Sequence, residues 1–293
     1  MDDTIYIYIN SLGCAWVKSL LMNTIILHTQ DLVIANKMAD AVGVEFESRA
    51  THFRFSMDKK INIAPLREAL SVDINYLPAF DFSKAGLFVS DMDSTLINIE
   101  CIDEIADFVN LKAQVAAITK RAMQGELDFN ASLIERVALF KGLDVSVLNQ
   151  VYTERLGVSS GGRELIQFFK TQGIKTAVVS GGFKYFTQRL AQDIGLDHDH
   201  ANELTIKNNQ LTGKVDGDIV NATTKAKFVT QLCRQYQISL SQAIVAGDGA
   251  NDLEMMKIAG LSVAYHAKPI VAKQANIVID FGGLDIMIDF FDG

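Results

Sequence analysis

The run Gly86-Leu87-Phe88-Val89-Ser90-Asp91-Met92-Asp93-Ser94-Thr95 joins an apolar segment to two acidic residues. Its apolar part, Leu87–Val89, has the composition of a buried strand. Asp91 and Asp93 follow two residues apart, so both side chains project to one side of an extended backbone. Such a pair places a nucleophile and a proton donor over one reacting atom, and it also attracts a hard divalent cation.

From Ala85 onward, apolar β-rich segments alternate with helical segments. This alternation predicts an α/β fold with a doubly wound parallel sheet. Ligands of such sheets bind beyond the carboxyl ends of the strands, so we expect Asp91, Ser180 and Asp248 to converge there. The expected strands are Leu87–Val89, Thr176–Val179, Ala243–Ala246 and Leu261–Ala264.

The segment between about Glu100 and Ser160 has a helical pattern instead. A helical insertion after the first strand would form a cap over the strand ends. Two later polar segments, joined by Asn208-Asn209, predict a hairpin. The expected helices are Leu111–Met123, Asn130–Phe140 and Val145–Leu156, and the hairpin strands are Asn202–Lys207 and Gln210–Val215.

The pattern of the first 80 residues predicts a separate, small α+β module. A regulatory role is our hypothesis for this module. Thr4–Ile9 resembles a strand, and Asp31–Val42 resembles a helix that Asp31 caps. Leu77–Asp81 reads as a connection. The predicted domains are therefore residues 1–80 for the N-terminal module, 84–99 with 161–293 for the core, and 100–160 for the cap.

Composition limits the classes of protein that this chain can represent. Its 293 residues are 49% apolar and 21% charged, an ordinary mixture for a soluble globular protein of two or three compact units. The net charge of −8 argues against a nucleic-acid-binding face. An anionic substrate would therefore need local positive charge, for which a bound cation, Lys225 and Arg136 are the candidates.

The cysteines and the N-terminus favour a cytoplasmic location. Cys14, Cys101 and Cys233 are widely spaced and form no C-x-x-C pair, which disfavours a disulfide framework or a zinc site. No basic segment follows Met1, and no apolar run approaches the ~20 residues that cross a bilayer. We expect neither a signal peptide nor a membrane partner.

Four motifs in order identify a family. They are Asp91-Met92-Asp93-Ser94-Thr95, Val179-Ser180-Gly181-Gly182, Lys225 and Gly247-Asp248-Gly249-Ala250-Asn251-Asp252, and together they resemble the haloacid dehalogenase-type phosphatases. Segments Asn98–Glu104, Arg121–Phe129 and Ser132–Val137 narrow the resemblance to the phosphoserine phosphatases within that family. The resemblance extends from about Ala85 to about Lys268.

The resemblance implies roles for the acidic residues. Asp91 corresponds to the nucleophile that forms an aspartyl-phosphate, and Asp93 to the general acid and base. Magnesium would be held by the side chain of Asp91, the backbone carbonyl of Asp93 and the side chain of Asp248. Asp252 would support the metal or its waters and anchor Lys225. Ligation by oxygen alone suits this ion.

The remaining implied residues bind substrate. Ser180 and Gly181, at the expected start of helix Phe183–Ile194, would bind the transferred phosphate together with Lys225 and Asn251. On the cap, Arg136 would bind a carboxylate in a bidentate manner and Glu100 an ammonium group. Met123 and Phe129 correspond to apolar residues that close over the substrate.

The implied activity is magnesium-dependent hydrolysis of O-phospho-L-serine, the final step of serine biosynthesis. The small-molecule substrate is the expected partner, with a second copy of the chain, in a homodimer, as a further candidate. One alternative keeps the core chemistry in a phosphotransferase or in a phosphatase for another ester. Another alternative is a phosphate-accepting regulator or binding protein, although Asp93 argues against it because a general base speeds hydrolysis of the acyl-phosphate.

Two further segments carry expectations. Relatives usually have Pro-Gly before the helix that follows the cap, whereas this chain has Ser159-Ser160-Gly161-Gly162. We expect a looser hinge and altered cap motion. His198-Asp199-His200 is expected to be a surface loop and not a metal site.

Overall fold

The computed structural model describes residues 23–292, which divide into two compact units. The smaller unit ends at Leu77, and the larger unit begins at Pro78. The predicted strand Thr4–Ile9 lies outside the described residues. Among residues 23–292, no helix has both the length and the apolar composition to span a bilayer.

The smaller unit is a four-stranded antiparallel sheet with two helices. In the described residues its strand order is β2-β3-β1-β4. Its elements are β1 (Asn23–Leu27), α2 (Leu32–Val42), β2 (Phe46–Ser48), β3 (Phe53–Met57), α3 (Ala64–Leu70) and β4 (Ile74–Tyr76). The predicted helix is confirmed, because the Asp31 carboxylate accepts the Val33 N–H at 2.7 Å at the start of α2. Ile25 and Phe55 pack against Met38 of this helix in one core.

The larger unit contains a seven-stranded sheet in the order β11-β10-β9-β5-β6-β7-β8. All neighbours are parallel except β7 and β8. The strands are β5 (Leu87–Ser90), β6 (Lys175–Phe183), β7 (His198–Lys207), β8 (Gln210–Asp216), β9 (Ala243–Gly247), β10 (Leu261–Tyr265) and β11 (Ile277–Ile279). The four predicted strands are confirmed as β5, β6, β9 and β10.

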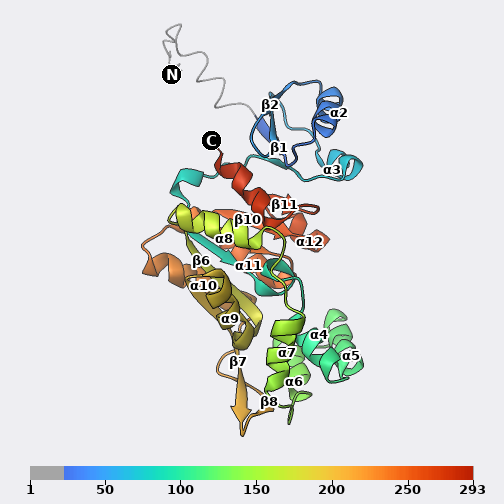
Figure 1. Ribbon diagram of the computed structural model, residues 1–293, viewed down its shortest axis with the longest axis vertical. Helices are drawn as coiled ribbons and strands as arrows, with labels where there is room; N and C mark the ends of the chain where they lie inside the picture. Colours follow the sequence, from blue (N-terminus) through green and yellow to red (C-terminus); the bar gives the residue numbers. More distant parts are fainter. Residues whose placement is uncertain (1–22, 293) are drawn as a thin grey trace, which may run out of the picture. The chain divides into compact units, whose positions relative to one another are not determined.

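Helices cover both faces of this sheet (Figure 1). Leu87 and Val89 belong to a core with Val229 of α10, whereas Phe88 points to the other face and packs on Phe169 of α8 with ring centroids 4.9 Å apart. A strand that is buried on both faces needs a continuous apolar run, and this explains the sequence of β5. The covering elements are α8 (Gly162–Thr171), α9 (Lys184–Ile194), α10 (Ala222–Gln235), α11 (Leu253–Ile258), α12 (Pro269–Ala272) and η5 (Leu284–Phe291), with short turns η1 (Phe82–Lys84), η3 (Leu240–Gln242) and η4 (Ala250–Asp252).

The cap is a bundle of four helices that follows the turn η2 (Met92–Leu96) and lies to one side of the sheet unit (Figure 1). The helices are α4 (Cys101–Phe108), α5 (Lys112–Met123), α6 (Phe129–Ala138) and α7 (Ser146–Glu154). Its two connections to the core run side by side, because Ile97 and Val158 form a bridge and the side-chain oxygen Oδ1 of Asn98 accepts the Gly157 N–H at 2.9 Å. The helical insertion is confirmed, and α4 is an additional helix that the pattern did not delimit.

The return connection contains a tight turn. The Gly162 N–H donates to the Ser159 carbonyl at 2.9 Å, and Gly161 has a φ of +71°. A Cβ on Gly161 would lie 2.0 Å from Asp285 Oδ1, so glycine is required here by both conformation and space. The expectation of altered cap motion stays a prediction.

The β7–β8 hairpin confirms one expectation and corrects another. Asn208 and Asn209 both have positive φ, of 52° and 61°, as a two-residue hairpin turn requires. The surface loop predicted at His198-Asp199-His200 is wrong, because these residues begin β7 and are half-buried. Parallel pairing with β6 makes these residues part of the sheet. In addition, Asp199 accepts the Thr187 hydroxyl at 2.9 Å, and His200 stacks on Phe228.

Candidate active site

The carboxyl ends of β5, β6 and β9 meet at one edge of the sheet, next to the cap. Asp91 follows β5, Ser180 lies near the end of β6, and Asp248 follows β9. A cavity of about 770 Å³ lies at this edge. Ten of the twelve predicted site residues line it, namely Asp91, Asp93, Glu100, Met123, Phe129, Arg136, Ser180, Gly181, Asp248 and Asn251.

The other two predicted residues, Lys225 and Asp252, lie beneath the cavity with no exposed surface. Lys225 Nζ is 2.8 Å from Asp91 Oδ1 and 2.7 Å from Asp252 Oδ1. Burial alone would lower the pKa of Lys225, but the carboxylates of Asp252 and Asp91 outweigh it and raise this pKa above its ordinary value. The two carboxylates therefore favour the charged form of Lys225, which contacts the Asp91 side chain from below.

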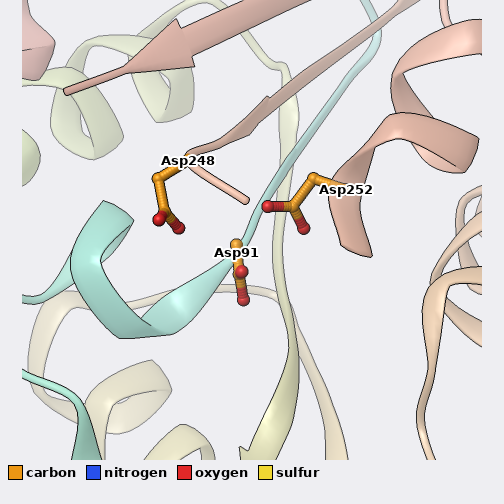
Figure 2. A group of neighbouring side chains, drawn as sticks. All are labelled: Asp91, Asp248 and Asp252. Atoms are coloured by element: carbon orange, nitrogen blue, oxygen red, sulfur yellow. The ribbon is translucent and has the colours of Figure 1, made fainter. Parts of the chain in front are cut away.

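Three carboxylates converge at this point from two segments of the chain: Asp91 follows β5, and Asp248 and Asp252 belong to the loop after β9 (Figure 2). One oxygen each from Asp91, Asp248 and Asp252 lies within 4.8 Å of the others. Burial and the charge of Asp252 raise the pKa values of both Asp91 and Asp248. Concentrated, desolvated carboxylate charge is stabilised by a hard divalent cation, so this donor set fits an ion of that kind.

Asp252 has the least freedom of the three carboxylates. Its Oδ1 pairs with Lys225, and its Oδ2 accepts the Gly249 N–H at 3.0 Å. A Cβ on Gly247 would lie 2.4 Å from the Asp252 carboxyl carbon, so only glycine leaves room for this packing. Asp91 and Asp248, which face the cavity, are therefore better placed to be direct ligands of a cation.

Asp93 connects the core with the start of the cap. Its Oδ1 accepts the Cys101 N–H at 2.7 Å, and its Oδ2 accepts the Ser180 hydroxyl at 3.0 Å. The following residue, Ser94, has a φ of +55°, which turns the chain sharply away from the strand direction. The Asp93 carboxylate is thus fixed at the cavity wall by two donors on different elements.

The Ser180-Gly181-Gly182 segment is a bulge at the end of β6. Pairing with β7 shifts register between Ser180 and Phe183, so the strand extends to Phe183 and does not end at Val179 as the sequence pattern predicted. Ser180 Oγ accepts the Gly182 N–H at 2.8 Å. Asn202 Nδ2 donates to the Gly181 carbonyl at 2.8 Å and thereby holds the bulge from the neighbouring strand.

The cap side of the cavity carries one acidic and one basic side chain. The Glu100 carboxylate accepts the Ser94 hydroxyl at 2.8 Å, and burial together with the charge of Asp93 raises the pKa of Glu100 to about 7. Arg136, on α6, is half-buried and donates to the Ser132 carbonyl at 3.2 Å. Burial lowers the pKa of Arg136, whereas Asp103 and Glu100 raise it.

The two apolar residues differ in their positions. Met123, at the end of α5, is 84% exposed at the rim of the cavity. Phe129, at the start of α6, reaches the core, where its Cζ lies 2.7 Å from the position of a Cβ on Gly181. A side chain on residue 181 would displace this ring, so the absence of one allows the cap and the core to touch.

The sequence analysis missed two residues at this site. Asn202 supports the bulge, and its only signal was a polar side chain in the predicted hairpin. Lys268 lines the cavity, and its backbone N–H donates to the Asp248 carbonyl at 3.0 Å. The sequence feature that could have indicated Lys268 was the pair Lys268-Pro269 after β10. The sequence pattern does not show, however, that this pair lies close to Asp248.

Comparison with known families agrees with the fold. A family model described as haloacid dehalogenase-like hydrolase matches residues 86–260. The chain belongs to the haloacid dehalogenase-like hydrolases.

Its relatives within that family include phosphoserine phosphatases. One from Albidiferax ferrireducens is 48% identical over 221 residues, which cover 74% of this chain and 93% of that protein. A crystal structure of a probable phosphoserine phosphatase from Vibrio cholerae, in unliganded form, has a TM-score of 0.82 and 37% identity, covering 93% of this chain and 87% of that chain. A structure of a phospho-aspartyl intermediate analogue of phosphoserine phosphatase has a TM-score of 0.65 and 38% identity, covering 70% of this chain and 98% of that chain.

Proposed function

We propose that this chain is a magnesium-dependent phosphatase that hydrolyses O-phospho-L-serine through an aspartyl-phosphate on Asp91. The observation that carries this proposal is the joint presence in one cavity of the paired carboxylates Asp91 and Asp93 and of the opposite charges of Glu100 and Arg136. Phosphoserine carries a phosphate, an ammonium and a carboxylate, and this cavity offers a complementary group for each.

The first chemical step is attack of an Asp91 carboxylate oxygen on phosphorus. Lys225 binds Asp91 Oδ1 from beneath the cavity and keeps the side chain in one orientation. As the bond from phosphorus to the serine oxygen breaks, Asp93 gives its proton to the departing alkoxide. The products of this step are free serine and a phosphate bonded to Asp91. A solved relative that carries a phospho-aspartyl intermediate analogue supports this route.

The second step hydrolyses the aspartyl-phosphate. Asp93, now ionised, takes a proton from a water molecule whose oxygen attacks phosphorus, and the bond between phosphorus and Asp91 breaks. Inorganic phosphate leaves and both carboxyl groups return to their initial states. Contacts with Ser180 and with the Cys101 N–H keep Asp93 in place through both steps.

The side chains of Asp91 and Asp248 and the backbone carbonyl of Asp93 would hold the magnesium ion, with Asp252 behind them. When bound, the ion neutralises phosphate oxygens and orients the phosphoryl group for in-line attack. Ser180, the N–H of Gly181 and Asn251 would bind the same phosphoryl group, and Lys225, buried behind Asp91, would balance its charge.

The cap selects the substrate. Arg136 would bind the carboxylate of the substrate in a bidentate manner, and ionised Glu100 would bind its ammonium group. Phe129 and Met123 would close over the serine moiety. Hydrolysis of this ester releases L-serine and phosphate, which would be the final step of serine biosynthesis.

The test measures phosphate release from a panel of esters with magnesium. L-Phosphoserine is compared with phosphoethanolamine, which lacks the carboxylate, and with 3-phosphoglycerate, which lacks the ammonium group. The wild type should prefer phosphoserine over each by about 10- to 100-fold in kcat/KM, because each missing group loses a charge-assisted hydrogen bond. Arg136→Met should reduce only the preference in kcat/KM for phosphoserine over phosphoethanolamine. Glu100→Gln should reduce only the preference in kcat/KM for phosphoserine over 3-phosphoglycerate.

Other outcomes would change the assignment in different ways. Equal rates on all three esters would keep the phosphatase chemistry and refute the assignment of phosphoserine. Phosphate transfer that requires an added alcohol would favour a phosphotransferase. Absence of release from every ester would contradict the enzymatic proposal altogether.

A further inference from the structure

Two basic side chains line the cavity, and they lie on opposite sides of it. Arg136 belongs to α6 of the cap, whereas Lys268 precedes α12 of the core and neighbours the Asp248–Asn251 loop. Lys225 is no substitute for a cation that faces the cavity, because it is fully buried and already paired with Asp91 and Asp252. Lys268 is therefore the basic group on the core side that an entering anion meets.

The backbone of Lys268 is fixed from both sides. Its N–H donates to the Asp248 carbonyl at 3.0 Å, and its own carbonyl accepts the Val271 N–H at 2.8 Å. The following Pro269 restricts Lys268 to an extended conformation, which it adopts with φ −59° and ψ 145°. The chain thus places the Cα of Lys268 beside a candidate metal ligand and leaves the flexible side chain to reach into the cavity.

The ammonium group of Lys268 is available for a ligand. In the part of the chain that the structure describes, no ion pair engages it, and the side chain is exposed. Its charge lowers the pKa of Asp248 against the larger effect of burial, which places the two groups within electrostatic range of each other. Around it the cavity is lined by the carboxylates of Asp91, Asp93 and Asp248, which repel an anion.

We propose that Lys268 is a phosphate-binding residue, whose ammonium group contacts a non-bridging oxygen of the substrate's phosphate and of the inorganic phosphate product beside Asp248. This inference rests on the proposed function for the nature of the anion. It leads to a pair of opposite effects. Removing the charge of Lys268 weakens phosphate binding, but it does not weaken binding of a divalent cation, because one positive charge near the cation has been removed.

The experiment titrates inorganic phosphate into the magnesium-saturated full chain, and separately magnesium into the chain without phosphate, by calorimetry. Lys268→Met should raise the Kd of phosphate about tenfold, and Lys268→Arg should restore it to within about threefold of wild type, since arginine keeps the charge. The Kd of magnesium should stay unchanged or fall in Lys268→Met. Lys273→Met, at the exposed far end of α12, is the matched control and should leave both values unchanged.

Two results would overturn the proposal. One is a phosphate Kd in Lys268→Met equal to that of the wild type. The other is a parallel loss of phosphate and magnesium binding that Lys268→Arg does not repair, which would assign Lys268 a structural role only. Phosphate binding requires no turnover, so a wild type that binds phosphate but fails to hydrolyse phosphoserine would contradict the proposed function and leave this test intact.

Discussion

Replacing Lys225 with methionine tests the buried charge cluster beneath the cavity. Methionine has similar length and no charge, so the substitution leaves Asp91 and Asp252 facing each other without a cation. Breaking a fully buried ion pair by removing one partner costs about 3–5 kcal/mol, because the other charge stays desolvated. Loss of the ammonium also removes an interaction that lowers the pKa of Asp91, so this carboxyl is driven further toward its protonated, non-nucleophilic form.

The measurement is urea unfolding of the full chain, followed by circular dichroism, with a chelator present. Lys225→Met should lose about 3–5 kcal/mol of unfolding free energy and its phosphatase activity. Lys227→Met, exposed on the same helix, should stay within about 0.5 kcal/mol of wild type. In the double variant Lys225→Met/Asp252→Asn, the cost should be smaller than the sum of the single costs, because neither buried charge remains at that contact. An active Lys225→Met variant with wild-type stability would refute this reasoning.

Three further predictions concern the cavity and its hinge. Burial raises the pKa of Glu100 to about 7, and only its ionised form binds an ammonium group, so KM for phosphoserine should rise as pH falls below 7. Glu100→Gln should flatten this dependence of KM on pH. An unchanged pH profile in Glu100→Gln would contradict the role of Glu100 in binding the ammonium group. Gly181→Ala should lower kcat/KM about tenfold, because the Cβ of the new alanine would lie 2.7 Å from Phe129 Cζ. Adding Phe129→Leu to this variant should recover part of the loss in kcat/KM, as steady-state kinetics can show. Ser160→Pro should raise the unfolding free energy by about 0.5–1 kcal/mol, since proline suits the position before Gly161 in the tight turn after the cap. The same substitution should slow cap opening, which relaxation-dispersion NMR can measure. Equal opening rates in the variant and the wild type would count against the hinge hypothesis.

The part of the site built on strand ends followed from the sequence. Apolar runs predicted β5, β6 and β9, and parallel pairing then requires that residues after these strands meet at one edge. Asp91, Ser180 and Asp248 could therefore be brought together before any distance was known. Their chemical roles came from the residue types and from the family resemblance, and these roles remain predictions.

The residues that the sequence did not reveal depend on pairing register and on long-range contacts. The bulge that aims Gly181 at Phe129 exists because the register between β6 and β7 shifts, and no local pattern encodes that shift. Asn202 acts through this pairing. Half-buried His198 was mistaken for a loop residue, because its hydrogen bond and ring contact with Tyr236, 38 residues away, leave no local signal in the sequence.

In the proposed reaction, Asp91 carries the phosphoryl group between substrate and water. The most direct measurement mixes the magnesium-loaded chain with phosphoserine, quenches it in acid within one turnover and maps the phosphate by peptide mass spectrometry. We expect a hydroxylamine-sensitive phosphate on Asp91, which is absent in Asp91→Asn. A phosphate on Ser180 or another hydroxyl, or turnover that persists in Asp91→Asn, would contradict it.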